Sequence, residues 1–438
     1  MLKTGTRERV DEIVTRTQAT SRAPSLVAAV VRAGEIAHYC AAGTTPTPSP
    51  DLQYRLGSIT KTMTAALVLG LRDAGQLDLD DRLTTHLPTV DLPGVRLRDL
   101  LGHASGLQRE PEGAWWERNP GVGLDELLAR VTSAKLAFGR YQRFHYSNLA
   151  YGLLGGVVER VTGTAWWEVL SARILTPLGM TRTTYHPTQP YARGYVAHPW
   201  DGSLREEPRE DARAMAPAGQ LWSTVDDMTQ FVAALTGHHP TVLSPTVLDE
   251  MARPVVLADP DRWSHGYGLG LQLWRSGERV YVGHTGSMPG YLAVVAVHRR
   301  SATGVVAFAN TYNLPGTGIG RVGMAILDAV LDHEPEPAAP TWQPSPGPAP
   351  ADVAPLLGVW WWMGRQHTAR WETDGSDGTL VLAGPGEEWR FTREGPDRWR
   401  GLTGEQAGEV LTVLRDPAGA VVGLDIATFV FRRDPMAD

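Results

Sequence analysis

The sequence predicts an α+β domain followed by a small all-β barrel. Three observations indicate this: strand-like segments stand at both ends of the first 334 residues with helical patterns between them, prolines crowd residues 335–355, and eight short segments rich in aromatic and branched residues follow. Strands separated by a long helical stretch imply a sheet that distant parts of the chain complete. We therefore expect a first domain over 1–334, a proline-rich linker over 335–355 and a barrel over 356–438.

The N-terminal segment predicts a surface helix followed by a hairpin. Apolar residues recur at helical spacing between Val10 and Val14. Residues 27–31 and 35–39 are short apolar segments on either side of a glycine-containing turn, which is typical of two paired strands. The first 21 residues carry charges throughout and hold no apolar run of the kind that a signal peptide needs, so we expect a cytoplasmic protein.

Helical patterns fill the middle of the first domain, and strands return near its end. From about Ser58 to Leu235 the apolar residues follow mostly helical spacing, with loops marked by Pro and Gly. Three runs rich in Val, Ala and Tyr then predict strands over 279–283, 291–298 and 304–310. A helix is expected to follow over about 320–331.

The last third of the chain changes character at a cluster of prolines. Eight prolines between residues 335 and 355 favour an extended linker over regular structure. Turn residues then separate short segments with aromatic and branched side chains, at 359–362, 369–372, 379–383, 389–392, 398–402, 409–415, 421–426 and 428–432. Short strands at such even spacing predict an antiparallel up-and-down barrel.

Composition excludes several classes of partner and site. With 41 basic and 48 acidic residues the net charge is −7, which argues against nucleic acid as a partner, and no apolar run is long enough to cross a membrane. The single cysteine, Cys40, excludes an intrachain disulfide and a cysteine-based metal cluster. His238 and His239 lack a third ligand at a suitable spacing. We therefore expect no metal and no cofactor.

Ser58 and Lys61 form the first candidate catalytic pair. They stand three residues apart where a turn ending at Gly57 leads into an apolar-rich helix, so both lie on one helix face. A helix N-terminus favours negative charge on the serine oxygen, and a desolvated lysine can act as a base. The chain contains only three lysines among its 41 basic residues, so a lysine here is informative. An N-cap serine followed by a surface lysine is the alternative interpretation.

Two further motifs can supply polar groups to the same cleft. Tyr146 and Asn148 stand two apart in a loop that enters an expected helix, where they can offer a proton shuttle and an orienting amide. His284 directly follows the strand expected over 279–283, and Gly286 lets a ligand backbone approach closely. A histidine with structural contacts alone is the alternative for His284.

In chain order, S-x-x-K, Y-S-N and H-T-G resemble the motifs of the serine β-lactamase and penicillin-binding-protein superfamily, above all its class C β-lactamase and D-D-peptidase branch. Further segments are similar to the framework of that branch: Leu100–Leu107 (LLGHASGL), Ile174–Tyr185, Ala218–Met228, Gly266–Gly270 (GYGLG) and Gly283–Ala293. The resemblance covers about residues 8–333. It implies a serine β-lactamase/transpeptidase-like domain, in which helices flank an antiparallel sheet and a helical subdomain is added.

The resemblance also implies acyl transfer through an acyl-Ser58 intermediate. Lys61 would take the serine proton, and Tyr146 would relay a proton to the leaving group. Asn148 would hold the geometry of Lys61 and the substrate amide. His284 would complete the polar wall opposite.

Residues after this histidine are expected to bind substrate along the strand edge. They are Thr285, Gly286 and Ser287, and the backbone amides of Ser58 and Ser287 are the candidates for an oxyanion hole. The third motif has histidine where class C β-lactamases have lysine. That difference favours peptidase, esterase or thioesterase chemistry over β-lactam hydrolysis.

The expected barrel, which opens with LLGVWWWMGRQHTARW, is similar to the lipocalin-like domain of penicillin-binding-protein-type thioesterases. That resemblance implies a stand-alone hydrolase of nonribosomal peptide and antibiotic biosynthesis. Such an enzyme takes a peptidyl thioester, commonly with a C-terminal D-residue, from a peptidyl carrier protein and releases it by head-to-tail macrolactamisation. The barrel is expected to roof the active site and to present Arg433 to the incoming residue. A solvated arginine near the C-terminus is the alternative for Arg433.

Two other functions stay open on the sequence. The first is a cytosolic D-stereoselective peptidase, aminopeptidase or esterase of the same superfamily, in which water hydrolyses the acyl-enzyme. The second is a catalytically inactive relative that only binds peptides. The presence of Ser58, Lys61, Tyr146 and Asn148 argues against the second.

Overall fold

The computed structural model describes residues 1–43, 48–312, 314, 318–334, 349–373 and 378–436. The chain divides into two compact units, Met1–Glu336 and Pro337–Asp438, each with its own hydrophobic core. Of the linker expected over 335–355, the part up to residue 348 lies outside the described residues. Within the described ranges no helix combines the length and the apolar character needed to cross a bilayer.

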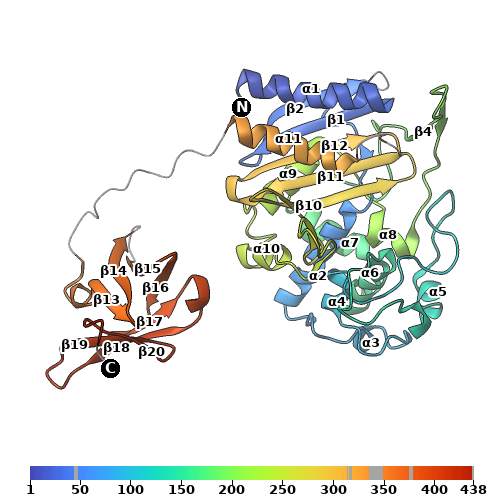
Figure 1. Cartoon of the computed structure of the whole chain (residues 1–438). Coiled ribbons are helices and arrows are strands. Elements are labelled where there is room, and N and C mark those ends of the chain that lie inside the picture. Colours follow the sequence, from blue (N-terminus) through green and yellow to red (C-terminus); the bar gives the residue numbers. More distant parts are fainter. Residues whose placement is uncertain (44–47, 313, 315–317, 335–348, 374–377, 437–438) are drawn as a thin grey trace. The chain divides into compact units, whose positions relative to one another are not determined.

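An eight-stranded antiparallel sheet forms the centre of the first unit (Figure 1). In spatial order its strands are β2 (Glu35–Gly43), β1 (Ser25–Arg32), β12 (Thr303–Ala309), β11 (Tyr291–His298), β10 (Arg279–Met288), β9 (Gln272–Ser276), β8 (His265–Tyr267) and β7 (Val256–Leu257). β1 pairs with β12 from Leu26 opposite Ala309 to Arg32 opposite Thr303. The expectation that distant parts of the chain complete one sheet is confirmed.

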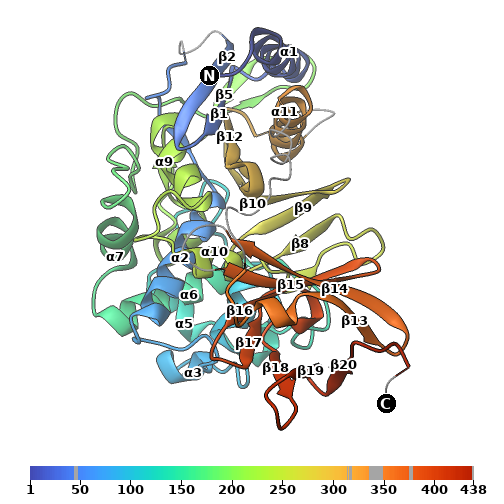
Figure 2. The ribbon, with the colours of Figure 1, turned by 90° about the vertical axis from the view of Figure 1, so that its left-hand side faces the viewer.

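Helices cover both faces of this sheet. Every residue of β1 from Ser25 to Val31 is buried, as expected of a strand with both faces covered. Alternate residues of β1 belong to two cores: Leu26 and Val30 pack with α1 (Thr4–Ser21) and α11 (Ile319–His333), whereas Val27 packs with α9 (Val225–Leu235). Figure 2 shows α1 and α11 on one side of β1 and β12, and α9 on the other.

The remaining helices of the first unit form the expected helical subdomain. They are α2 (Ile59–Asp73), α3 (Leu83–His86), α4 (Leu97–Leu101), α5 (Leu124–Ala129), α6 (Asn148–Thr162), α7 (Trp166–Leu170), α8 (Ala216–Gly219) and α10 (Pro245–Met251). Two small antiparallel pairs join β3 (Tyr54–Arg55) to β6 (Trp222–Ser223) and β4 (Tyr195–Ala197) to β5 (Leu204–Glu206). α2 is buried throughout residues 59–69, so the helix that begins at the candidate nucleophile runs through the core.

The second unit is a nearly closed barrel of eight antiparallel strands. They follow one another in chain order as β13 (Gly358–Trp362), β14 (Arg365–Thr373), β15 (Gly378–Gly384), β16 (Glu387–Arg393), β17 (Arg398–Gly401), β18 (Val410–Arg415), β19 (Val421–Ile426) and β20 (Phe429–Phe431). Trp361 and Arg432 exchange two backbone hydrogen bonds of 2.7 and 2.8 Å, which join the first strand to the end of the last. Trp360, Phe391 and Trp399 fill the interior. The up-and-down arrangement expected from the sequence is confirmed.

Two features of the first unit differ from the expectation. β7, β8 and β9 were not expected, because these strands are short and the glycine-rich stretch Gly266–Gly270 covers the end of β8 and the turn after it. β10 runs on to Met288, so His284 lies within this strand and not directly after it. The physical reason is pairing: β11 continues opposite β10 through the whole motif, from Val282 to Met288.

Candidate active site

Ser58 stands at the N-terminus of α2, after a sharp turn of the backbone. Gly57 has a φ of +54°, a conformation that favours glycine. A Cβ at Gly57 would lie only 2.5 Å from the backbone nitrogen of Ser287. The turn that presents Ser58 is therefore in direct contact with strand β10.

Lys61 lies one turn into α2 with its side chain fully buried. Its Nζ donates to Ser58 Oγ at 3.0 Å and to the backbone oxygen of Ala218 at 2.6 Å. Burial holds the pKa of Lys61 well below its ordinary value, and the charge of Glu110 opposes this effect only in part. A lysine that releases its proton readily can take the proton of Ser58, so the pair fits a nucleophile and its base.

Tyr146 and Asn148 lie at the start of α6, where the side chain of Ser147 caps the helix. Tyr146 lines the same pocket as Ser58, and Lys61 Nζ lies 5.1 Å from the centre of the tyrosine ring. Burial raises the pKa of Tyr146, so the hydroxyl keeps its proton at rest. Tyr146 is therefore placed to pass a proton between Ser58 and a leaving group.

Glu110 holds Asn148 in place, and the sequence did not single it out. Asn148 Nδ2 donates to Oε1 of Glu110 at 2.7 Å, and the indole N–H of Trp115 donates to Oε2 at 2.9 Å. Arg109 also donates to Oε1, at 3.1 Å. Glu110 lies three residues after the LLGHASGL segment, so its position next to that segment is the signal that could have identified it.

His284 is buried in β10 with about one hundredth of its surface exposed. Its Nδ1 donates to the backbone oxygen of Thr285 at 2.5 Å, so Nε2 is the unprotonated nitrogen; among the described atoms Nε2 has no hydrogen-bond partner. Burial, and then the charge of Lys61, lower the pKa of His284 to about 3. The centres of the His284 and Tyr146 rings are 6.2 Å apart. His284 is thus a neutral acceptor and not a charge, and its expected place in the polar wall opposite Ser58 stays a prediction.

Thr285, Gly286 and Ser287 continue β10 along the edge of the site. A Cβ at Gly286 would lie 1.8 Å from the backbone oxygen of the residue before Gly57, and 3.3 Å from the backbone nitrogen of Ser58. Only glycine allows this approach. Gly57 and Gly286 let the backbone of Ser58 lie beside that of Ser287. The backbone N–H groups of the two serines therefore fit the expected oxyanion hole.

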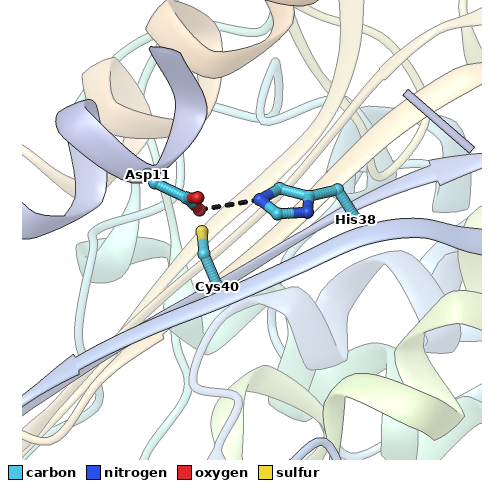
Figure 3. Close-up of side chains that lie close together, drawn as sticks. All are labelled: Asp11, His38 and Cys40. Atoms are coloured by element: carbon cyan, nitrogen blue, oxygen red, sulfur yellow. Dashed lines mark hydrogen bonds and ion pairs between the residues drawn. The ribbon is translucent and has the colours of Figure 1, made fainter. Parts of the chain in front are cut away.

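These residues meet at a pocket of about 970 Å³. The pocket lining includes the predicted residues Ser58, Tyr146, Asn148, Thr285, Gly286 and Ser287, while Lys61 and His284 are buried behind it. Sequence reasoning missed the other polar and aromatic residues of the lining, namely Arg109, Glu110, Trp115, Trp116, Glu117, Asn119, Phe144, His265, Tyr267, Gln272 and Tyr312. Tyr267 lies in the GYGLG segment, whereas the two tryptophans lie in a loop with no such signal. The three described side chains that could together hold a metal ion lie on α1 and β2 instead (Figure 3).

Arg433 is the one predicted site residue that lies in the second unit. Its guanidinium donates to the backbone oxygens of Pro355, Leu357 and Val359 at 2.7, 2.9 and 2.7 Å. It also lies 3.6 Å from the centre of the Trp360 ring. The structure gives Arg433 contacts within its own unit, and a contact with substrate stays a prediction, as does a roof formed by the barrel.

Both units match known protein families. Residues 10–322 match the model described as Beta-lactamase, and residues 349–433 match a domain of unknown function, DUF7586. Penicillin-binding protein 4 of Amycolatopsis lactamdurans is 30% identical over 349 residues, which cover 73% of this chain and 87% of that protein. Beta-lactamase-like protein 2 of Dictyostelium discoideum is 27% identical over 320 residues, which cover 68% of this chain and 58% of that protein.

Solved structures repeat the same fold. A D-stereospecific amidohydrolase from Streptomyces sp. superposes with a TM-score of 0.63 and 25% identity, over 74% of this chain and 98% of that chain. SurE superposes with a TM-score of 0.60 and 23% identity, over 98% of this chain and 99% of that chain. The likeness to SurE is one of fold and extends over most of both chains.

Proposed function

The chain belongs to the β-lactamase family, whose members are serine hydrolases and acyl-transferases, and we propose that this protein is a stand-alone thioesterase and macrocyclase. Its proposed substrate is a nonribosomal peptide held as a thioester on a peptidyl carrier protein, with a D-residue at the C-terminus. Ser58 accepts the peptide as an ester. The peptide then leaves by head-to-tail macrolactamisation.

The first half of the reaction forms the acyl-enzyme. Neutral Lys61 accepts the proton of Ser58 Oγ, and the oxygen attacks the thioester carbonyl. The backbone N–H groups of Ser58 and Ser287 stabilise the negative charge that develops on the carbonyl oxygen. The carbon–sulfur bond breaks, and the thiol leaves with the proton that Lys61 delivers through Tyr146. The product is an ester between the peptide and Ser58.

The second half releases the peptide. The N-terminal amine of the same chain attacks the ester carbonyl, and the amine proton passes to Tyr146 and Lys61. The ester carbon–oxygen bond breaks, and Ser58 Oγ regains a proton. A new amide closes the ring without consuming water, so exclusion of water from the pocket favours this outcome.

One observation carries the acyl-transfer part of the proposal: the buried Nζ of Lys61 stands 3.0 Å from Ser58 Oγ, and its pKa is depressed. The D-residue is supported by the 25% identity to an amidohydrolase that is described as D-stereospecific. The cyclisation step rests on the resemblance of the second unit to the lipocalin-like domain of penicillin-binding-protein-type thioesterases.

The test uses two linear peptidyl pantetheine thioesters that differ only in the configuration of the C-terminal residue. We expect the D-form to give a cyclic product, lighter than the free acid by one water in mass spectrometry. The Ser58→Ala variant should give neither cyclic product nor acyl adduct. Free acid as the sole product would refute cyclisation. No turnover by the unaltered protein would refute the proposal that it is an enzyme acting on peptidyl thioesters.

A hydrolytic function is the second candidate, and Glu110 favours it. This carboxylate lines the pocket and contacts Asn148, so it can attract a free ammonium group on the substrate. That would suit a D-amino-acid amidase or aminopeptidase. The check is a pair of D-amino acid amides, one with a free amine and one with an acetylated amine. Glu110→Gln should lower kcat/KM for the free amine clearly more than for the acetylated substrate. Equal effects on both substrates would speak against an ammonium subsite.

A further inference from the structure

Asp11, His38 and Cys40 bring three different metal-ligand atoms to one place in the first unit (Figure 3). His38 and Cys40 stand two apart on β2, so their side chains point to the same face of the strand. Asp11 lies on α1, which packs against that face. The ligand atoms of the three residues all lie within 4.8 Å of one another.

We propose that these three side chains bind one Zn²⁺ ion per chain, with a water molecule as the fourth ligand. Thiolate, imidazole and carboxylate are the zinc ligands of proteins, and three protein ligands with one open position are a common zinc arrangement. A sulfur and a nitrogen donor favour zinc over magnesium or calcium, which prefer oxygen. The sequence led us to expect no metal, because it holds a single cysteine and His238 and His239 lack a spaced third ligand. Asp11 and His38 stand 27 residues apart and were not singled out.

The proposed zinc site is separate from the pocket at Ser58. β2 is the edge strand of the sheet, and three strands, β1, β12 and β11, stand between it and β10, which carries His284. At the usual spacing of hydrogen-bonded strands this places β2 about 19 Å from β10. Zinc at this position therefore has no direct part in acyl transfer.

The geometry requires only small movements of the side chains. A tetrahedral zinc ion holds nitrogen, oxygen and sulfur ligands about 3.3–3.6 Å apart. His38 Nε2 and Asp11 Oδ1 are 2.7 Å apart, so they must separate by less than about 1 Å. The sulfur of Cys40 must approach its partners by at most about 1.5 Å. Asp11 can adjust because its side chain is half exposed, and this exposure also gives the ion a path from solvent.

Zinc binding replaces a weak sulfur contact and the 2.7 Å hydrogen bond between His38 and Asp11 with bonds to the metal. Cys40 Sγ donates to the backbone oxygen of Ala28 at a long 3.7 Å. When zinc binds, the S–H bond breaks, a Zn–S bond forms, and the proton passes to solvent. His38 and Cys40 belong to the edge strand and Asp11 to the N-terminal helix, so the ion ties helix to sheet. Zinc is expected to raise the Tm of the first unit.

The test is metal binding by the full chain after removal of bound metals with a chelator. Equilibrium dialysis should give one Zn²⁺ per chain, and Co²⁺ should give a thiolate-to-cobalt charge-transfer band, because that band requires a sulfur ligand. Cys40→Ala should abolish the band. His38→Gln should weaken zinc binding by at least about tenfold.

Matched controls separate this site from surface binding. Asp11→Asn should weaken binding, whereas Glu12→Gln, its neighbour on α1, should not. His239→Ala removes a histidine far along the sequence and should leave binding unchanged. Less than stoichiometric zinc, or a cobalt band that persists in Cys40→Ala, would overturn the proposal. Should Cys40→Ala fail to fold, unchanged affinity in the partly exposed His38→Gln variant would overturn it as well.

Discussion

Lys61 shows at the scale of one residue why the active site needs its particular side chain. An arginine keeps its proton in proteins, whereas burial makes a lysine give up its proton more easily. Lys61 is fully buried, and its Nζ is held between Ser58 Oγ and the backbone oxygen of Ala218. The scarcity of lysine in the sequence pointed to a position where a lysine, unlike an arginine, can act as a base, although only the fold supplied the burial.

Substitution of the nucleophile and of its base should separate their roles. We expect Ser58→Ala to lower kcat for thioester cleavage by at least about 10⁴-fold, because no acyl-enzyme forms. Lys61→Arg should lower kcat by about 10² to 10⁴-fold, because the guanidinium cannot accept a proton. Lys3→Arg, on an exposed lysine, is the control and should retain full activity. Full activity in Lys61→Arg would show that another group is the base.

The depressed pKa of Lys61 also predicts how stability depends on pH. The pKa of this lysine is lower in the folded than in the unfolded chain, so between the two values the unfolded chain binds more protons. The free energy of unfolding should therefore rise with pH across that window. Lys61→Met should be more stable than the unaltered protein at neutral pH and should show a smaller rise toward alkaline pH. Urea denaturation at neutral and at alkaline pH checks this. The same rise in the free energy of unfolding in both proteins would contradict the prediction.

At the scale of elements, contact between α2 and β10 assembles the site. Gly57 in the turn before α2 and Gly286 in β10 allow two backbones to approach more closely than side chains permit. The nucleophile and the candidate oxyanion groups come from these two elements, and Tyr146 comes from the start of α6. The sequence predicted the existence of all three elements. The approach of α2 to β10 depends on packing between segments more than 200 residues apart, about which periodicity carries no information.

Adding one methyl group at this contact should disturb the site. In Gly286→Ala the new Cβ would lie 1.8 Å from a backbone oxygen, so β10 must move away from Ser58. We expect a loss of about 1–3 kcal/mol in the free energy of unfolding and a large fall in kcat. Gly70→Ala in α2 is the matched control, because nothing outside the helix lies within 4 Å of its new Cβ. That variant should gain about 0.5–1 kcal/mol and keep its kcat. The same loss of stability in both would refute the close contact.

The whole molecule consists of two units whose buried residues form separate clusters. In the first unit a single sheet separates two cores, and in the second a barrel of eight strands encloses one. Because each unit has a hydrophobic core of its own, each is expected to unfold in its own transition.

Core substitutions in each unit provide the check. Leu424→Ala in the barrel and Leu153→Ala in α6 both remove a fully buried side chain, and each should cost its own unit about 2–5 kcal/mol. Calorimetry of the full chain should show that each variant lowers one transition only. Leu424→Ala should also leave unchanged the rate at which a small thioester acylates Ser58. A joint shift of both transitions would mean that the units unfold together.

The two-part organisation, the barrel strands and the residues of the three motifs could be predicted from the amino-acid sequence, because periodicity, turn residues and local spacing act over short distances. It did not reveal β7–β9, the place of His284 within β10, the support of Asn148 by Glu110, or the meeting of Asp11 with Cys40. These features became visible only in the folded chain. Each depends on which distant segments pack side by side, and that is settled by burial and strand pairing across the whole chain.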